Sequence, residues 1–433
     1  MATKKNSKRR AVIIGGTRTP FVKAFKEFLH LDSIDLAGSA AGSLIEKYAV
    51  PRNEIDSIVW GGVVLPSMAP NIAREVALDL GLPHRVEGMT CTRACASGLQ
   101  AVTLAAAAIE RGEYDVAIAG GSDSTSNGEL KMPQKFVRTV GPVVMGGKAS
   151  PADYLQVLAQ LAPFTDLIPK MPRIAERTTG QVMGEAAEEM AKRNEISRTE
   201  QDEFTVASHH RAAAAMASGR FDDEVAAVST RSGQVFADTL VRADTSVERL
   251  AKLRPVFAKD GTLTAGNSSP LTDGASAVLI MSEEKAKALG YTPKAAFRSW
   301  AYRAVDPADQ LLMGPALAMP AAVDRAGLEL KDIDLIDMHE AFAAQVLSVI
   351  RMLESDAFAK ARLNRSKAIG QIDRSRLNVH GGSVALGHPF GATGARMVTT
   401  MANELVLSDK NTALLGICAA GGLGAGAVLE RVG

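Results

Sequence analysis

The sequence predicts an α/β protein that consists of two similar halves, and three observations support this prediction. Apolar residues make up 46% of the 433-residue chain but aromatic residues only 5%, a composition that suits helices packed closely on a sheet. Short apolar runs that end in glycine alternate with helical patterns along the chain. The same order of strand and helix patterns occurs again near the C-terminus, which indicates an internal duplication.

The first half is expected to begin with a buried strand in AVIIGGTRTP, followed by a helix over about residues 33–48. A second strand is predicted in IDSIVWGGVV, from residue 55. The Ala-rich stretch 95–111 predicts a buried helix that ends before Gly112, because alanine and leucine favour helices and glycine ends them. The strand DVAIAGGSDS follows directly, and AVLIM near residue 280 is expected to complete this half.

The second half repeats these segments. KDIDLIDMHEAF resembles NEIDSIVWGGVV, and NTALLGICAAGG resembles YDVAIAGGSDS, each preceded by a helical pattern. The copies are offset by roughly 280 residues at the first pair and by about 20 more at the second. The second half is therefore expected to carry an extra loop over about residues 358–376.

The chain between the two copies has a different character, with charged helical patterns such as GEAAEEMAKRNEISRTEQDEF. Ser197 is expected to cap one of these helices, since Glu200 follows at the spacing of a capping box. We interpret this segment as an inserted, mainly helical cover domain. Three domains are thus expected: residues 1–126 with 260–290, residues 127–259, and residues 291–433.

Charge and hydropathy argue against several classes of protein. The formal net charge of +1 argues against a nucleic-acid partner, and no apolar run reaches the about 20 residues that a membrane span needs. The start MATKKNSKRR lacks the apolar stretch of a secretory signal and is interpreted as a solvated tail. We therefore expect a soluble, cytoplasmic protein.

Three cysteines, Cys91, Cys95 and Cys418, are too few and too unevenly spaced for a disulfide framework. No histidine lies near them at zinc-finger spacing, so no metal site is expected. Cys95 begins the Ala-rich helix, where free backbone amides and the helix dipole favour a thiolate, and it is therefore a candidate nucleophile. The alternative is a buried, inert thiol, which is our interpretation of Cys91.

Two histidines and a second cysteine occupy other predicted turns. His388 stands in the glycine-rich NVHGGSVALGHPFGATGARM and can activate a thiol, although tight helix packing or phosphate binding would also explain the glycines. Cys418 ends a predicted strand, at the carboxyl edge where open α/β sheets bind ligands. His339 and Glu340 lie at the end of the strand predicted in KDIDLIDMHEAF. A structural hydrogen-bond network is the alternative explanation for these two residues.

Together these segments resemble the thiolase family, and the resemblance extends from TRTPF at Thr17 to the last glycine-rich loop. Five motifs occur in family order: the nucleophile motif around Cys95, GNSSPLTDGA from Gly266, HEAF, GHP at His388 and CxxGG at Cys418. The resemblance implies duplicated βαβαβαββ halves in an α/β/α/β/α arrangement, with an inserted, mainly helical loop domain.

Within the family, HEAF with His339 and CAAGGLG with Ala420 resemble the 3-ketoacyl-CoA thiolase (acetyl-CoA acyltransferase) subunits of fatty-acid oxidation, or trifunctional, complexes. Biosynthetic thiolases usually carry asparagine and glycine at these positions. A water that the asparagine holds in other thiolases would here be replaced, or held, by His339.

The resemblance also implies a role for each site residue. Cys95 would be the nucleophile and His388 its activating base, and Cys418 would be the acid/base that delivers a proton to the acetyl-CoA carbanion as the carbon–carbon bond breaks. His388 would hold the enolate oxygen together with His339 or a water.

Backbone amides of Cys95 and Ala420 would hold the tetrahedral oxyanion. Ser269 would contact the pantetheine arm of coenzyme A, and Met183 would line the substrate pocket.

The activity implied is cleavage of 3-ketoacyl-CoA by CoA in fatty-acid β-oxidation, through an acyl-cysteine intermediate. CoA is then a substrate, and no cofactor is expected. A homodimer or homotetramer is expected, with a hydratase/dehydrogenase subunit as a candidate partner. Three alternatives stay open: a biosynthetic acetoacetyl-CoA thiolase, a decarboxylating ketoacyl synthase, against which Cys418 argues, and a non-catalytic lipid-binding or scaffold subunit.

Two features favour medium or long acyl chains over acetoacetyl-CoA alone. Short-chain thiolases carry His-Met-Gly where this chain has Val182, Met183 and Gly184, and an apolar branch favours an alkyl chain by roughly 25 cal/mol per Å² buried. Apolar side chains also share a predicted helical face at Tyr154, Leu155, Leu158 and Leu161, followed by Phe164, Leu167 and Ile168. Packing on the inserted domain, an acyl tunnel wall, or contact with a partner or membrane would each explain this face.

Overall fold

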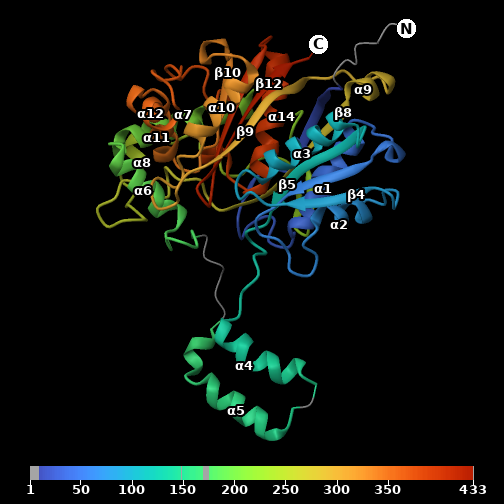
Figure 1. Cartoon of the computed structure of the whole chain (residues 1–433), viewed down its shortest axis with the longest axis vertical. Helices are drawn as coiled ribbons and strands as arrows, with labels where there is room; N and C mark the ends of the chain where they lie inside the picture. The colour runs from blue at the N-terminus through green and yellow to red at the C-terminus, as the bar shows by residue number, and fades with distance from the viewer. Residues whose placement is uncertain (1–8, 148, 169–174, 433) are drawn as a thin grey trace. The chain divides into compact units, whose positions relative to one another are not determined.

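Ten strands form one hydrogen-bonded sheet in the computed structural model, which describes residues 9–147, 149–168 and 175–432. The sheet consists of two half-sheets, which meet edge to edge where Val12 pairs with Ala296 and Ile13 with Ala295. Most of the first half is blue to teal in Figure 1, and the second half is orange to red. The basic start up to residue 8, interpreted as a solvated tail, lies outside the described residues.

The two half-sheets have the same strand order. The first contains, from the shared edge outward, β1 (Ala11–Arg18), β8 (Thr272–Ser282), β5 (Val116–Asp123), β3 (Ser57–Gly61) and β4 (Glu87–Cys91), with the short β2 (Val22–Lys23) on β8. The second contains β9 (Ala295–Ala304), β12 (Leu423–Arg431), β11 (Thr412–Ala419) and β10 (Leu335–Met338).

The directions of the strands also match. β3 and β5 are parallel, as are β10 and β11, while β8 and β12 run antiparallel to both of their neighbours. This equivalence confirms the predicted duplication. The place of β4 is taken in the second half by a single parallel bridge between Ile336 and Leu377.

Two helices lie between the halves. α3 (Ser97–Arg111) and α14 (Gly391–Leu407) pack against each other, α3 mainly on the first half-sheet and α14 on strands of both. Around them a buried apolar cluster includes Val102 of α3, Val398 of α14 and Leu415 of β11. The outer helices of the first half are α1 (Ser33–Lys47), α2 (Ile72–Asp79) and the short α9 (Glu283–Ala288).

Outer helices of the second half begin with α10 (Pro315–Ala326), which covers β12 and β9. The others are α11 (Ala343–Leu353), α12 (Asp356–Arg362) and α13 (Ser383–Leu386). The segment predicted as an extra loop over 358–376 thus begins inside a helix, because Ser355 Oγ caps α12 by accepting from Phe358 N at 3.2 Å. The helix–sheet–helix–sheet–helix layering agrees with the predicted fold class.

Residues inserted between β5 and β8 are divided between two compact bodies. The larger body comprises residues up to 127 and from 175 onward, and the smaller comprises residues 128–174. In the larger body the insertion forms α6 (Met183–Arg193), α7 (Arg198–Ala217), β6 (Val228–Thr230), β7 (Gly233–Val235) and α8 (Val247–Leu250). α7 begins with the predicted capping box, in which Glu200 N donates to Ser197 Oγ and Ser197 N to the Glu200 carboxylate.

The smaller body is a pair of helices, α4 (Gln134–Met145) and α5 (Pro151–Leu161), followed by a 3-10 turn (Phe164–Leu167). Of the predicted apolar face of α5, Leu161 is buried, whereas Tyr154, Leu155 and Leu158 are each more than half exposed. Among the described residues, no helix is both long and apolar enough to span a membrane.

The contact between α3 and α14 depends on glycine, and this predicts a stability effect. A methyl group added at Gly98 would lie 2.3 Å from the carbonyl oxygen of Gly391, so Gly98→Ala should cost about 1–3 kcal/mol of unfolding free energy. Gly38 in α1 has no atom within 4 Å of its added methyl group, and Gly38→Ala should be neutral or stabilising by up to about 1 kcal/mol. Denaturant unfolding of both variants measures this difference, and equal midpoints would contradict it.

Candidate active site

Cys95 lies in the turn between β4 and α3, two residues before the helix begins. The backbone of Ala94 is left-handed, with φ 45°. Ser97 Oγ fixes the turn, since it accepts from Arg93 N at 2.7 Å and donates to the Ala94 carbonyl at 2.6 Å. The turn therefore presents the thiol at the N-terminal end of α3.

The thiol of Cys95 is protonated at neutral pH. Burial raises the pKa of Cys95 to about 12; a hydrogen bond from the backbone of Ala420 opposes this shift, and the charge of Asp123 adds to it. Desolvation of the sulfur thus opposes the stabilisation of a thiolate that the helix start predicts. Cys95 needs a base before it can act as a nucleophile.

His388 lies between α13 and α14 and is 5% exposed. Its backbone N–H donates to Thr272 Oγ1 at 3.0 Å, and its Nδ1 lies 2.6 Å from Thr393 Oγ1 in the first turn of α14. Its Nε2 is buried and has no hydrogen-bond partner within the described chain. When Thr393 accepts the Nδ1 hydrogen, Nε2 keeps the lone pair that a general base uses.

His339 follows β10 and is fully buried. Its backbone N–H donates to the Gly416 carbonyl of β11 at 2.8 Å, and its Nδ1 lies 2.9 Å from Ser383 Oγ. The imidazole centroids of His339 and His388 are 4.1 Å apart, and Nε2 of His339 is likewise unpartnered among the described residues. One ligand atom from each of Cys95, His339 and His388 lies within 4.8 Å of the other two.

Both histidines are neutral at physiological pH. Burial lowers the pKa of His388 to about 3, and the positive charge of Arg396 acts in the same direction. Burial also lowers the pKa of His339 well below its usual range, with smaller effects from His388 and Arg396. Arg396 is itself paired with Asp337 at 2.9 Å, and both side chains are only 2% exposed. This ion pair links α14 to β10, the two elements next to the histidines.

Cys418 lies near the end of β11 and is buried. Burial raises the pKa of its thiol well above the usual value, and the next largest effect comes from Cys95, so the two thiols are close enough to interact. Ala420 follows β11, and its backbone hydrogen bond to Cys95 brings an amide beside the nucleophile. The structure therefore brings five of the residues singled out in the sequence to one site.

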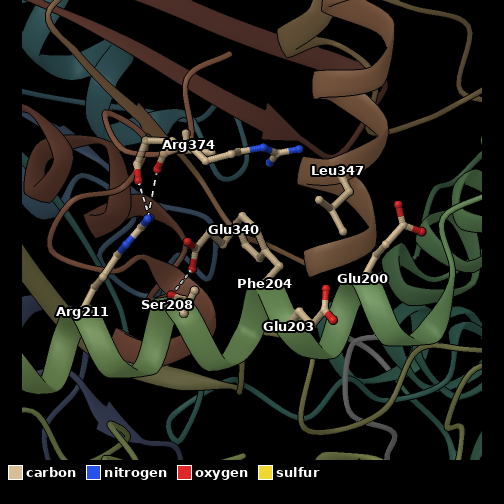
Figure 2. Close-up of a pocket in the computed structure, with 10 residues that line it drawn as sticks. Glu200, Glu203, Phe204, Ser208, Arg211, Glu340, Leu347 and Arg374 are labelled. Atoms are coloured by element: carbon tan, nitrogen blue, oxygen red, sulfur yellow. Dashed lines mark hydrogen bonds between the residues drawn. The ribbon is translucent and has the colours of Figure 1, made fainter. Parts of the chain in front are cut away.

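Glu340, which follows His339 in the HEAF motif, faces a pocket of about 320 Å³ between α7 and α11 (Figure 2). Its carboxylate accepts hydrogen bonds from Ser208 Oγ, Asn378 Nδ2 and the backbone N–H of Val384. Arg211 of α7 donates to backbone carbonyls on the far wall of the same pocket. These contacts favour the structural interpretation of Glu340, as part of a network that fixes the turn after His339.

Asp123 at the end of β5 joins three segments around the nucleophile. Its carboxylate accepts from the backbone N–H groups of Val63, Val64 and Gly391, the last at 2.7 Å. Burial raises the pKa of Asp123 to about 7, and these amide bonds oppose the shift. Because Gly391 is the first residue of α14, this carboxylate fixes the helix that follows His388.

The roles of the remaining residues singled out in the sequence, Ser269 and Met183, stay predictions. Ser269 donates its backbone N–H to the carbonyl of Ala341, two residues after His339. Met183 begins α6 and packs on the cluster that contains Phe342. Cys91 is half-buried, and burial raises the pKa of its thiol to about 11.

Sequence reasoning missed the two hydroxyl groups that hold the imidazoles, those of Thr393 and Ser383. Thr393 lies five residues after His388 within the same glycine-rich motif, and this short spacing was the available signal. Ser383 is more than forty residues from His339, so only the fold relates them.

Comparisons with known proteins agree with this architecture. The family models for the thiolase N-terminal and C-terminal domains match residues 11–284 and 291–431. A 3-ketoacyl-CoA thiolase from Yersinia pestis (strain Pestoides F) is 45% identical over 425 residues, which cover 97% of each chain.

Two solved structures are similar over nearly the whole chain. Human mitochondrial 3-ketoacyl-CoA thiolase in complex with CoA is 30% identical, with a TM-score of 0.83 and 98% of each chain covered. The acetyl-CoA acetyltransferase of Bacillus anthracis is 31% identical, with a TM-score of 0.82, and the match covers 99% of this chain and 100% of that one. The chain therefore belongs to the thiolase family.

Proposed function

We propose that this protein is an acetyl-CoA C-acyltransferase that cleaves 3-ketoacyl-CoA with CoA, giving acetyl-CoA and a shortened acyl-CoA, in fatty-acid β-oxidation. The observation that carries this proposal is the meeting of Cys95 with two neutral imidazoles that have unpartnered Nε2 atoms, beside the second thiol of Cys418. The name of the 45% identical Yersinia relatives supports a 3-ketoacyl-CoA substrate.

In the first step, the Cys95 thiol gives its proton to Nε2 of His388 while the sulfur attacks the 3-keto carbonyl. The neutral state of both groups suits this transfer, since the charged pair forms only during the attack. The carbon–carbon bond then breaks to leave an acyl group on Cys95 and the enolate of acetyl-CoA.

Two negatively charged oxygens need hydrogen-bond donors during this step. The backbone amides of Cys95 and Ala420 would donate hydrogen bonds to the oxyanion of the tetrahedral intermediate. The Ala420 amide already lies beside the Cys95 sulfur. After His388 has accepted the thiol proton, its Nε2–H can donate to the enolate oxygen. His339 can do the same when its Nδ1 accepts the hydroxyl hydrogen of Ser383.

Cys418 then protonates the enolate carbon to release acetyl-CoA. In the second half of a ping-pong cycle, the thiol of free CoA gives its proton to the Cys418 thiolate and attacks the acyl-Cys95 thioester. The Cys95 thiolate that leaves takes back the proton held by His388, so both thiols and the imidazole return to their starting states, and CoA is a substrate and not a cofactor. The raised pKa of Cys418 keeps its proton in place until a carbanion develops beside it.

The same residues would perform the reverse condensation, and the fold similarity to an acetyl-CoA acetyltransferase favours a biosynthetic thiolase as the second candidate. His339 in place of asparagine and the apolar Val182 favour the degradative role. We still predict that the enzyme accepts 3-ketoacyl-CoA substrates with medium or long acyl chains. A non-catalytic scaffold would have no use for the three converging side chains of Cys95, His339 and His388.

By resemblance, we expect the enzyme to act in the cytoplasm as a homodimer or homotetramer. A separate hydratase/dehydrogenase subunit is the partner that a β-oxidation role implies, since it would supply the 3-ketoacyl-CoA.

Substitution of the two thiols is expected to separate the two chemical roles. Cys95→Ser should abolish acyl-enzyme formation, because a serine hydroxyl beside a neutral imidazole is a far weaker nucleophile. Cys418→Ala should still acylate with a simple acyl-CoA but lose carbon–carbon bond exchange. Intact-protein mass spectrometry and a thiolysis assay measure the two activities, and equal loss of both in Cys418→Ala would contradict this division.

The protonation state of the resting nucleophile can be measured directly. Ultraviolet difference spectra between the wild type and Cys95→Ala should show no thiolate absorbance from about pH 6 to about pH 9, because the pKa of Cys95 is raised to about 12. Cys91→Ala is the matched control, since the pKa of that thiol is raised as well. A thiolate signal at neutral pH that only Cys95→Ala removes would mean that the resting pair is ionised.

Thr393 is expected to act through His388 by fixing its ring. Thr393→Val keeps the shape but loses the hydroxyl, and should lower kcat for acylation about ten- to hundredfold with little change in KM. Thr393→Ser retains the hydroxyl and should restore most of the rate. If Thr393→Ser is as impaired as Thr393→Val, the hydroxyl group does not restore the rate, and the role proposed for this hydrogen bond is contradicted.

A further inference from the structure

We propose that Cys95, His339 and His388 also form a binding site for a soft divalent cation, Zn²⁺ in particular, which occupies the substrate-free enzyme and inhibits it reversibly. This inference goes beyond the proposed function, because the catalytic cycle derived above uses no metal. It also differs from the expectation, based on sequence spacing, that no metal site is present.

The geometry of the three side chains carries the inference. Their ligand atoms, one from each residue, lie within 4.8 Å of one another. Zinc binds nitrogen at about 2.0–2.1 Å and sulfur at about 2.3 Å, so tetrahedral ligands are about 3.3–3.6 Å apart. Side-chain movements of about 1 Å therefore suffice to close the three atoms around one ion. Two imidazoles and one cysteine leave a fourth position for water, as in open zinc sites.

The two imidazole nitrogens are prepared for a metal. Nε2 of His339 and of His388 is buried and has no hydrogen-bond partner among the described residues. Each ring is held through Nδ1 by a hydroxyl group, Ser383 Oγ at 2.9 Å and Thr393 Oγ1 at 2.6 Å. Such contacts to the second ring nitrogen orient metal-binding histidines, and Nε2 is free to ligate in the tautomer in which Nδ1 donates its hydrogen to the hydroxyl group.

Binding exchanges one proton for one metal ion. Both histidines are already neutral, whereas the Cys95 thiol must lose its proton to solvent when it ligates Zn²⁺. No oxidation or reduction is involved.

The charged and titratable groups around the site affect this exchange. Asp123 on β5 places a carboxylate near the Cys95 sulfur, and Cys418 on β11 adds a second protonated thiol. Arg396 on α14 opposes a cation, but its charge is paired with Asp337 on β10. The site therefore favours a metal that prefers thiolate and imidazole, such as Zn²⁺ or Cd²⁺, over Mg²⁺ or Ca²⁺.

His339 is the residue that makes this site specific to chains with HEAF. An asparagine at that position would leave one thiol and one imidazole, which is too few ligands for tight binding. His339, which this chain carries in place of asparagine, thus makes the enzyme sensitive to inhibition by a metal ion.

Zinc binding by the full-length, chelator-treated protein without substrate tests the inference. Isothermal titration should detect one Zn²⁺ per chain with a Kd of about 1 μM or less near neutral pH. Co²⁺ in place of Zn²⁺ should give a thiolate-to-metal charge-transfer band that Cys95→Ala removes. His339→Asn should weaken zinc binding at least about a hundredfold, whereas Cys418→Ala and Cys91→Ala should keep wild-type affinity.

Three results would overturn the inference: no binding up to about 100 μM Zn²⁺, unchanged binding in His339→Asn, or loss of binding in Cys418→Ala that equals the loss in His339→Asn. The last would mean that the two thiols hold the ion. Thiolysis activity without zinc binding would overturn this inference and leave the proposed function standing. Zinc binding with no thiolysis would support the inference and overturn the proposed function.

Discussion

The close contact between α3 and α14 is the constraint on which the site depends. Gly98 and Gly394 let the two backbones approach so closely that no side chain fits between them. Because each helix begins next to one reactive residue, this contact brings Cys95 and His388 together from opposite halves of the chain. Asp123 strengthens the arrangement by accepting the first backbone N–H of α14. The position of the nucleophile relative to its base is therefore a property of backbone packing.

Burial determines the electrostatics of the resting site. The same loss of hydration raises the pKa of the Cys95 thiol and lowers the pKa of His388, so the pair remains uncharged. An ionised pair would need polar groups to replace its lost hydration, and Arg396, a buried cation near the histidines in the part of the chain that the structure describes, already has a partner in Asp337. A neutral imidazole also keeps a lone pair on one ring nitrogen. This lone pair can accept a proton during catalysis, or bind a metal ion when no substrate is present.

The sequence could predict what depends on local pattern. The repeated strand patterns located β3 and β10 as equivalents, and the spacing of Ser197 and Glu200 located the start of α7. It could not predict the pKa of Cys95, because the helix dipole is visible in a sequence whereas desolvation depends on which segments cover the sulfur. For the same reason Ser383 gave no signal, since its contact with His339 arises only from the fold.

The position of β8 has a consequence for synthesis on the ribosome. β8 pairs with both β1 and β5, yet its residues follow the whole insertion in the chain. A nascent chain that already contains the nucleophile must therefore wait, with β1 unpaired and β5 paired only to β3, until residue 282 has been translated. In the second half β9 also waits for the last strand, β12, but no inserted domain separates the two. The order of translation thus makes the first half the part that most needs protection by chaperones.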